Sequence, residues 1–217
     1  MSTKIKSEGK CLFCQKSFAK AGISRHLRVH LKKEAPAVKK KSYHLRIEAG
    51  RYFINLLMDG DASMDELDTF LRNIWLECCG HLSQFSFGSW GEEIPMEIPA
   101  KKVFSTGSKL TYVYDFGSTT ELTIKAFQDY PIAVKEGILL LSRNEPLNIK
   151  CDTCQKEEAE FICTVHWDGG DCFFCKACAE LHEQECDEAE YAMCPVVNSP
   201  RMGVCAYEGG QIDVARD

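Results

Sequence analysis

The sequence lacks any apolar stretch near the roughly 20 residues that a membrane-spanning helix needs. Its first ten residues, MSTKIKSEGK, also lack the apolar run of a secretory signal peptide. No internal repeat or low-complexity tract is present. These absences predict a protein that is neither secreted nor inserted in a membrane. We therefore expect a cytoplasmic location, where thiols normally stay reduced.

Cysteine is nearly absent from the middle of the chain, where only Cys78 and Cys79 occur. The other members of the set of 13 cysteines gather near the two ends. An odd number of reduced cysteines fits poorly with a disulfide framework and favours metal ligands. Two alternatives are weaker. A thioredoxin-like CxxC pair needs a βαβ setting that the pattern does not show, and interspersed histidines disfavour iron–sulfur ligation.

Basic residues are scarce in the last third of the chain and abundant in the first fifth. Residues 151–217 carry 4 Lys/Arg and 15 Asp/Glu, a balance of −11. Residues 43–150 have a balance of −5 and residues 1–42 a balance of +10. A basic head can bind a nucleic-acid backbone by counterion release, whereas an acidic tail repels one. The more common interpretation of such charge runs is a solvated surface.

The N-terminal cysteines belong to the pattern Cys11-x2-Cys14 followed by His26-x3-His30. With Phe18 and Ile23 between the pairs, this pattern resembles the Cys2His2 zinc finger. It has 11 residues between Cys14 and His26, one fewer than usual. The resemblance implies a hairpin and a helix that share one zinc ion, with Lys20, Ser24 and Arg25 available for contacts. A single finger reads only about 3 base pairs, and a lone finger can equally serve as a protein-contact module.

The C-terminal segment contains four short-spaced ligand pairs, and their alternating order favours a cross-brace with two zinc ions. The pairs are Cys151 with Cys154, Cys163 with His166, Cys175 with Cys178, and His182 with Cys186. Pairs one and three are expected to hold one ion, and pairs two and four the other. Residues 173–182 resemble B-box-like cross-braced zinc modules. Cys172, Cys194 and Cys205 are left over. So many thiolates indicate structural rather than catalytic zinc.

The segment 43–150 has the patterns of an α+β domain. Alternating or apolar runs predict strands at residues 43–47, 52–57, 82–87, 110–114 and 121–125, the last two forming a hairpin. Ser63 and Glu66 form a capping box that predicts a helix ending near Gly80. We expect a small antiparallel sheet with one main helix, flanked by two zinc modules. The expected divisions are a finger at 1–31, a basic linker at 32–42, the α+β domain at 43–150 and a zinc module at 151–217, with the linker decoupling the finger.

The order of motifs in the middle segment resembles the Ri-plasmid open-reading-frame-three-like family, an α+β family of plasmids and mobile elements. The most specific motif is Tyr112-Val113-Tyr114-Asp115-Phe116-Gly117. The pieces at residues 43–47, 63–68 and 80–85 and the tail at 195–205 also look similar to that family. The resemblance implies the fold but no biochemical activity.

An active site in the middle segment is the alternative to a purely structural role. Asp115, Glu121, His81 and Cys79 are candidate polar groups, and residues 117–120 a candidate anion nest. The simpler interpretation is a hairpin turn, with buried aromatic residues and buried small cysteines around it. No catalytic residue is assigned, and whether the protein is an enzyme stays open. The sequence favours a zinc-binding, non-enzymatic interaction protein with an unidentified protein partner, or alternatively a nucleic-acid-binding protein that uses residues 1–42.

Overall fold

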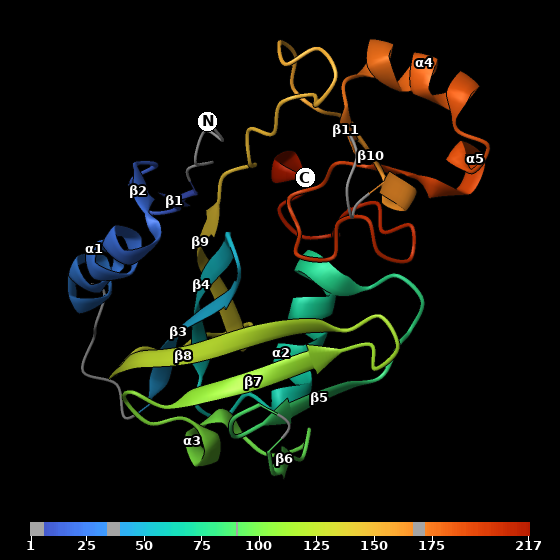
Figure 1. Ribbon diagram of the computed structural model, residues 1–217. Coiled ribbons are helices and arrows are strands. Elements are labelled where there is room, and N and C mark those ends of the chain that lie inside the picture. Colours follow the sequence, from blue (N-terminus) through green and yellow to red (C-terminus); the bar gives the residue numbers. More distant parts are fainter. Residues whose placement is uncertain (1–6, 34–39, 90, 167–171) are drawn as a thin grey trace. The chain divides into compact units, whose positions relative to one another are not determined.

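The structure is a computed structural model that describes residues 7–33, 40–89, 91–166 and 172–217 (Figure 1). Its described residues fall into two compact units. The sheet unit comprises Ser7–Arg72 and His81–Glu145. The C-terminal unit comprises Asn73–Gly80 and Pro146–Asp217. The short segment Asn73–Gly80 therefore belongs with the cysteine-rich end of the chain, although it lies far from it in sequence.

The sheet unit is built on nine antiparallel strands in the order β2-β1-β9-β4-β3-β8-β7-β5-β6. The strands are β1 (Glu8–Cys11), β2 (Ser17–Ala19), β3 (Ser42–Ala49), β4 (Tyr52–Asp59), β5 (Ser83–Ser86), β6 (Glu93–Ile94), β7 (Lys109–Tyr114), β8 (Thr120–Tyr130) and β9 (Ile138–Asn144). The strands β7 and β8 are antiparallel neighbours, with Lys109 opposite Lys125 at one end and Tyr114 opposite Thr120 at the other. This pairing confirms the hairpin that the alternation predicted.

The helices α1 (Lys20–Lys33), α2 (Met64–Leu71) and α3 (Ala100–Val103) accompany these strands. The predicted capping box is confirmed, because Glu66 N donates to Ser63 Oγ and Ser63 N donates to the Glu66 carboxylate. A π-helical turn, η1 (Arg72–Leu76), follows α2, so the helical path ends before Gly80. In Figure 1, α1 lies beside β1 and β2.

The finger region is part of the sheet, since β1 pairs with β9. Leu12 N also donates to Leu141 O at 3.0 Å. One apolar cluster joins α1 to the strands; its buried members are Cys11, Ile23, Leu27, Leu31, Phe53, Leu57, Tyr130, Val134 and Leu141. The helix is therefore held by ordinary core packing as well as by any metal.

A network of hydrogen bonds between buried polar side chains lies beside this cluster and links α1 to the strands. Ser24 Oγ donates to Asn55 Oδ1 at 2.9 Å, and Asn55 Nδ2 donates to Ser142 Oγ at 3.0 Å. His44 Nε2 donates to the same Asn55 oxygen at 3.0 Å. These side chains are almost fully buried. Because buried polar groups need partners, the network specifies how the helix sits on the sheet.

The C-terminal unit has little regular structure. Its central strand β10 (Phe161–Cys163) pairs with β11 (Phe173–Phe174) and β12 (Met193–Pro195). Its helices are η2 (Thr164–His166), α4 (Lys176–Glu185), α5 (Ala189–Ala192) and η3 (Val214–Arg216). Two small apolar clusters lie around β10, one centred on Ile162 and Tyr207, the other on Cys163 and Phe174. Such small clusters give limited stability by themselves.

The mixed α and β content was expected, but the sheet is larger than the small one that the sequence predicted. Two sources explain the difference. The sequence analysis did not predict β6 and β9, and it placed β1 and β2 in a separate finger. The predicted linker 32–42 falls mainly on residues 34–39, outside the described residues; Lys33 ends α1, and Ser42 begins β3.

Among the described residues, no helix is both long enough and apolar enough to cross a membrane.

Candidate metal centres

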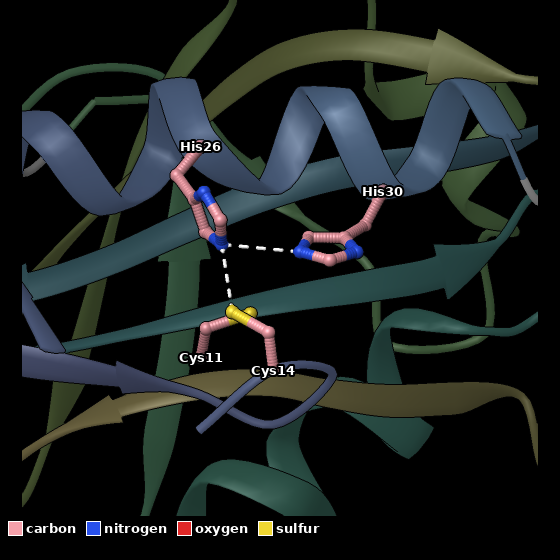
Figure 2. A group of neighbouring side chains, drawn as sticks. All are labelled: Cys11, Cys14, His26 and His30. Carbon is pink, nitrogen blue, oxygen red and sulfur yellow. Dashed lines mark hydrogen bonds between the residues drawn. The ribbon is translucent and has the colours of Figure 1, made fainter. Parts of the chain in front are cut away.

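The first group of ligands comes from the β1–β2 turn and from α1 (Figure 2). The ligand atoms of Cys11, Cys14, His26 and His30 all lie within 4.8 Å of one another. His26 Nε2 lies 3.2 Å from Cys14 Sγ and 3.1 Å from His30 Nε2. Burial, followed by the nearby His30 and Lys16, lowers the pKa of His26. The imidazole is thus held in the neutral form that binds metals.

The two thiols of this group are positioned by a tight turn. Gln15 N donates to Cys11 O at 2.7 Å, and Gln15 Nε2 donates to Leu12 O at 3.0 Å. Gln15 has φ of 61°, in the left-handed region that closes such a turn. Burial raises the pKa of the Cys11 thiol, although backbone N–H groups of Cys14 and Phe13 oppose that effect. A cation at this place would remove the cost of burying the thiolate.

The eight ligands of the C-terminal unit form two further groups. Cys151, Cys154, Cys175 and Cys178 make one, and Cys163, His166, His182 and Cys186 make the other. Within each group the ligand atoms again lie within 4.8 Å of one another. The structure thus brings together all twelve residues expected from the sequence, and the groups follow the alternating order of the pairs. Helix α4 contributes to both groups, because Cys175 caps its start and Cys186 its end.

The four-cysteine group repeats the turn of the first group. Gln155 N donates to Cys151 O at 3.0 Å, Gln155 Nε2 donates to Asp152 O at 2.7 Å, and Gln155 has φ of 56°. Burial tends to raise the pKa of Cys151, but the backbone N–H groups of Cys154, Cys175 and Thr153 outweigh it and lower the pKa to about 6. In the same cluster, the hydrogen bond to Cys175, burial and the neighbouring Cys151 raise the pKa of Cys178 to about 12. Such opposed shifts are expected where thiols crowd without a cation.

The group of two cysteines and two histidines contains a ligand atom that has no hydrogen-bond partner among the described residues. His182 Nε2 is buried and has no hydrogen-bond partner among the described residues. Phe174 stacks on the His182 ring at 4.2 Å between centroids, as Phe18 stacks on His26 at 4.2 Å. A buried polar atom without a partner is costly. A metal ion is the partner that this nitrogen and its neighbouring thiols fit.

These three groups match the ligand types that zinc prefers. Zinc takes four sulfur or nitrogen ligands in a tetrahedron, with bonds of about 2.3 Å to sulfur and about 2.0 Å to nitrogen. Ligand atoms spaced within 4.8 Å of one another can satisfy those bonds. Each group supplies four protein ligands and so can fill every position of the tetrahedron. This arrangement is typical of structural sites.

One feature of these sites was not recognised in the sequence. Both CxxC turns continue with glutamine, as Cys11–Gln15 and Cys151–Gln155, and this shared signal predicts the shared turn. Cys172 and Cys194, left over in the sequence, belong to none of the metal-type groups among the described residues.

The expected contact residues of the finger need correction. Lys20 forms an ion pair with Glu48 and donates to Gly50 O, and Ser24 is buried against Asn55. Only Arg25 stays exposed. In base-reading fingers the contacts come from positions −1, 3 and 6 of the helix. Counted from Lys20, these are Ala19, Gly22 and Arg25, of which two offer no side-chain donor.

The candidate active-site groups of the middle segment are largely explained by turn geometry. Asp115 has φ of 63°, and its Oδ1 accepts from Gly117 N at 2.9 Å and Ser118 N at 3.1 Å. Two N–H groups of the supposed anion nest are therefore already used. His81 Nε2 lies 3.6 Å from Asp115 Oδ2. Tyr112 and Tyr114 are buried as expected, whereas Phe116 is exposed.

Comparisons with known proteins give little to add to this geometry. No family model matches the chain, and no curated protein matches it. A solved structure described as a protein of unknown function from Methanosarcina mazei Go1 is similar with a TM-score of 0.39 and 14% identity. That similarity covers 48% of this chain and 67% of the other.

Proposed function

We propose that this protein is a zinc-binding protein in which three structural zinc ions hold surfaces for contacts with other macromolecules. The observation that carries the proposal is that three groups each offer four cysteine or histidine ligands. A catalytic zinc keeps one position open for water. Four protein ligands in each group leave no such position, which supports a structural role.

The partner is proposed to be another protein, in the cytoplasm. In the finger region, Leu12, Phe13 and Val29 are exposed apolar residues, and Phe13 also stacks on the His30 ring. Exposed apolar side chains on a metal-fixed loop suit a protein contact. Membership of the sheet unit in the Ri-plasmid open-reading-frame-three-like family is likewise proposed, on the motif that runs from Tyr112 to Gly117 across the end of β7.

Metal content tests this proposal. Protein purified without chelator should carry three zinc ions per chain in native mass spectrometry, with zinc identified by elemental analysis. Cys14→Ser should lower the count to two, since it removes one ligand of the finger group. Cys172→Ser, which changes a cysteine outside every group, should keep three. A wild-type protein without bound metal would rule out the proposal.

Nucleic-acid binding is the second candidate, and one observation favours it. The exposed side of α1 carries Arg25, Arg28, Lys32 and Lys33. Because two of the three base-contact positions lack a side-chain donor, binding should be sequence-tolerant and governed by phosphate charge. The test is a titration of labelled duplex DNA against wild type and a variant with Arg25→Ala and Lys32→Ala. Affinity should fall steeply between roughly 50 and 200 mM salt and should weaken in the variant. Equal binding by both proteins would exclude this surface.

A further inference from the structure

Two thiols outside the three zinc groups flank one buried guanidinium in the C-terminal unit. Arg201 Nη2 lies 3.4 Å from Cys205 Sγ and 3.7 Å from Cys78 Sγ. Arg201 is fully buried, whereas Cys205 is exposed and Cys78 half-buried. The sequence predicted Cys78 and Cys79 as buried small hydrophobic residues; Cys79 is instead exposed.

The surrounding backbone is built to hold this arrangement. Ser199 Oγ donates to Trp75 O at 2.6 Å, and Arg201 N donates to Ser199 Oγ at 2.8 Å. Gln211 N donates to Asn73 O at 2.6 Å. These bonds tie the segment Asn73–Gly80 to the C-terminal segment on both sides of Cys205 in sequence. The thiols are therefore brought together by defined contacts.

Cys205 also lies in an unusual turn. Cys205 and the next residue, Ala206, have φ of 52° and 50°. Consecutive left-handed conformations at residues other than glycine are strained, and such strain concentrates at functional sites. The strained residue, Cys205, is the same one whose sulfur lies next to the Arg201 guanidinium.

The guanidinium favours an anion beside it. Arginine stays charged at any ordinary pH, and a buried cation is stabilised by a neighbouring negative charge. The Arg201 guanidinium therefore places a positive charge beside both sulfurs. At the adjacent Cys79, the hydrogen bond to Cys78 and the charge of Cys78 raise the pKa of the thiol. Oxidation-sensitive cysteines combine a cationic neighbour, exposure and a nearby second thiol.

We propose that Cys205 and Cys78 form a thiol pair that is oxidised to a disulfide by hydrogen peroxide. The Cys205 thiolate attacks one peroxide oxygen, the O–O bond breaks, and the leaving hydroxide takes a proton to become water. Cys78 then attacks the sulfur of the Cys205 sulfenic acid, releasing a second water. Two thiols and one peroxide give one disulfide and two waters, so peroxide is the only oxidant required. The product links Asn73–Gly80 covalently to the C-terminal segment.

Peptide mapping tests the proposal on the full, zinc-loaded chain. The protein is treated with equimolar hydrogen peroxide at pH 7, blocked with N-ethylmaleimide and digested with trypsin. Cleavage after Arg72, Lys101, Arg201 and Arg216 gives peptides 73–101 and 202–216. These two peptides should become disulfide-linked through Cys205 and Cys78, while the bound zinc count stays constant.

Two variants give the matched controls. Cys205→Ser should abolish the link and slow peroxide consumption about tenfold, because it removes the attacking thiolate. Cys172→Ser, which removes another cysteine outside the zinc groups, should leave both unchanged.

Three results would overturn the proposal. Peroxide could release zinc while Cys205 stays a thiol. Cys205 could link to a zinc-group cysteine instead. Cys205 could also resist N-ethylmaleimide in untreated protein until a chelator removes a further metal ion, which would make it a metal ligand. The last result leaves the three structural zinc sites intact, so this proposal can fail without the proposed function.

Discussion

The finger region and the C-terminal unit use the same metal-binding turn in very different surroundings. Both turns end in a left-handed glutamine, Gln15 and Gln155, and both regions stack a phenylalanine on a helical histidine. The finger is joined to a nine-stranded sheet, whereas the C-terminal unit has a three-stranded sheet and small apolar clusters. The same ligand chemistry should therefore matter far more to folding in the C-terminal unit.

The largest effect should come from Cys175→Ser in the C-terminal unit. This residue starts α4, and α4 carries ligands of both C-terminal groups. Structural zinc contributes about 10–16 kcal/mol in small modules, more than the roughly 3–5 kcal/mol of a small apolar core. The variant should lose two zinc ions and unfold most of residues 151–195. Native mass spectrometry that showed the loss of only one ion would mean that the two sites are independent.

A smaller effect is expected from Cys14→Ser in the finger. The lysine-rich linker suggested that damage would stay within residues 1–31. Because β1 pairs with β9 and Leu27 packs in the shared cluster, we now expect it to reach β9. The melting temperature of the sheet unit should fall by roughly 5 °C, with β3 and β8 still folded. An unchanged melting temperature in calorimetry would restore the independent finger.

Acid should act on the sheet unit through His44 as well as through zinc loss. Burial lowers the pKa of His44 to about 4, although its hydrogen bond to Asn55 opposes the shift. The folded state disfavours protonation, so stability is complete above about pH 6.5 and declines as the pH falls toward 4. The expected loss is about 3 kcal/mol.

His44→Asn isolates this contribution, because asparagine does not titrate in the same range. Urea unfolding of the sheet unit between pH 7 and pH 4 should show a shallower pH dependence in the variant than in wild type. Parallel curves for the two proteins would show that His44 is not responsible.

The smallest effect concerns the capping box of α2, which depends on no metal. Ser63→Ala removes the oxygen that accepts from Glu66 N and should cost about 1 kcal/mol. Thr69→Ala, at an exposed position within α2, should be neutral or slightly stabilising because alanine favours helices. Denaturant midpoints compare the two, and equal midpoints would mean that the cap contributes nothing.

Sequence reasoning reached furthest where a local pattern decides the structure. The capping box at Ser63, the β7–β8 hairpin and the four alternating ligand pairs all follow from short spacings. Two ligands that are three or four positions apart must lie close together in space, so these pairs could be predicted from the sequence alone.

The pairing of segments that are far apart in the sequence could not be predicted in the same way. Nothing near Cys11 indicates that its strand joins β9, more than 120 residues later. The association of Asn73–Gly80 with the C-terminal segment depends on individual hydrogen bonds, such as the one from Ser199 Oγ to Trp75 O. Such bonds produce no periodic pattern in the sequence. The burial of Ser24 was missed because the neighbouring Arg25 and Arg28 suggest an exposed face of the helix. Its hydrogen-bond partner, Asn55, lies on a strand that is distant in the sequence.

Hydrogen exchange after metal removal tests the contrast between the two regions most directly. The wild-type protein is compared with and without a chelator, and amide exchange is followed by mass spectrometry for peptides of each unit. We expect the amides of residues 151–195 to lose protection almost completely, while those of β3, β4 and β8 keep theirs. Protection in residues 151–195 that survives complete zinc removal would contradict the structural role of zinc in the C-terminal unit.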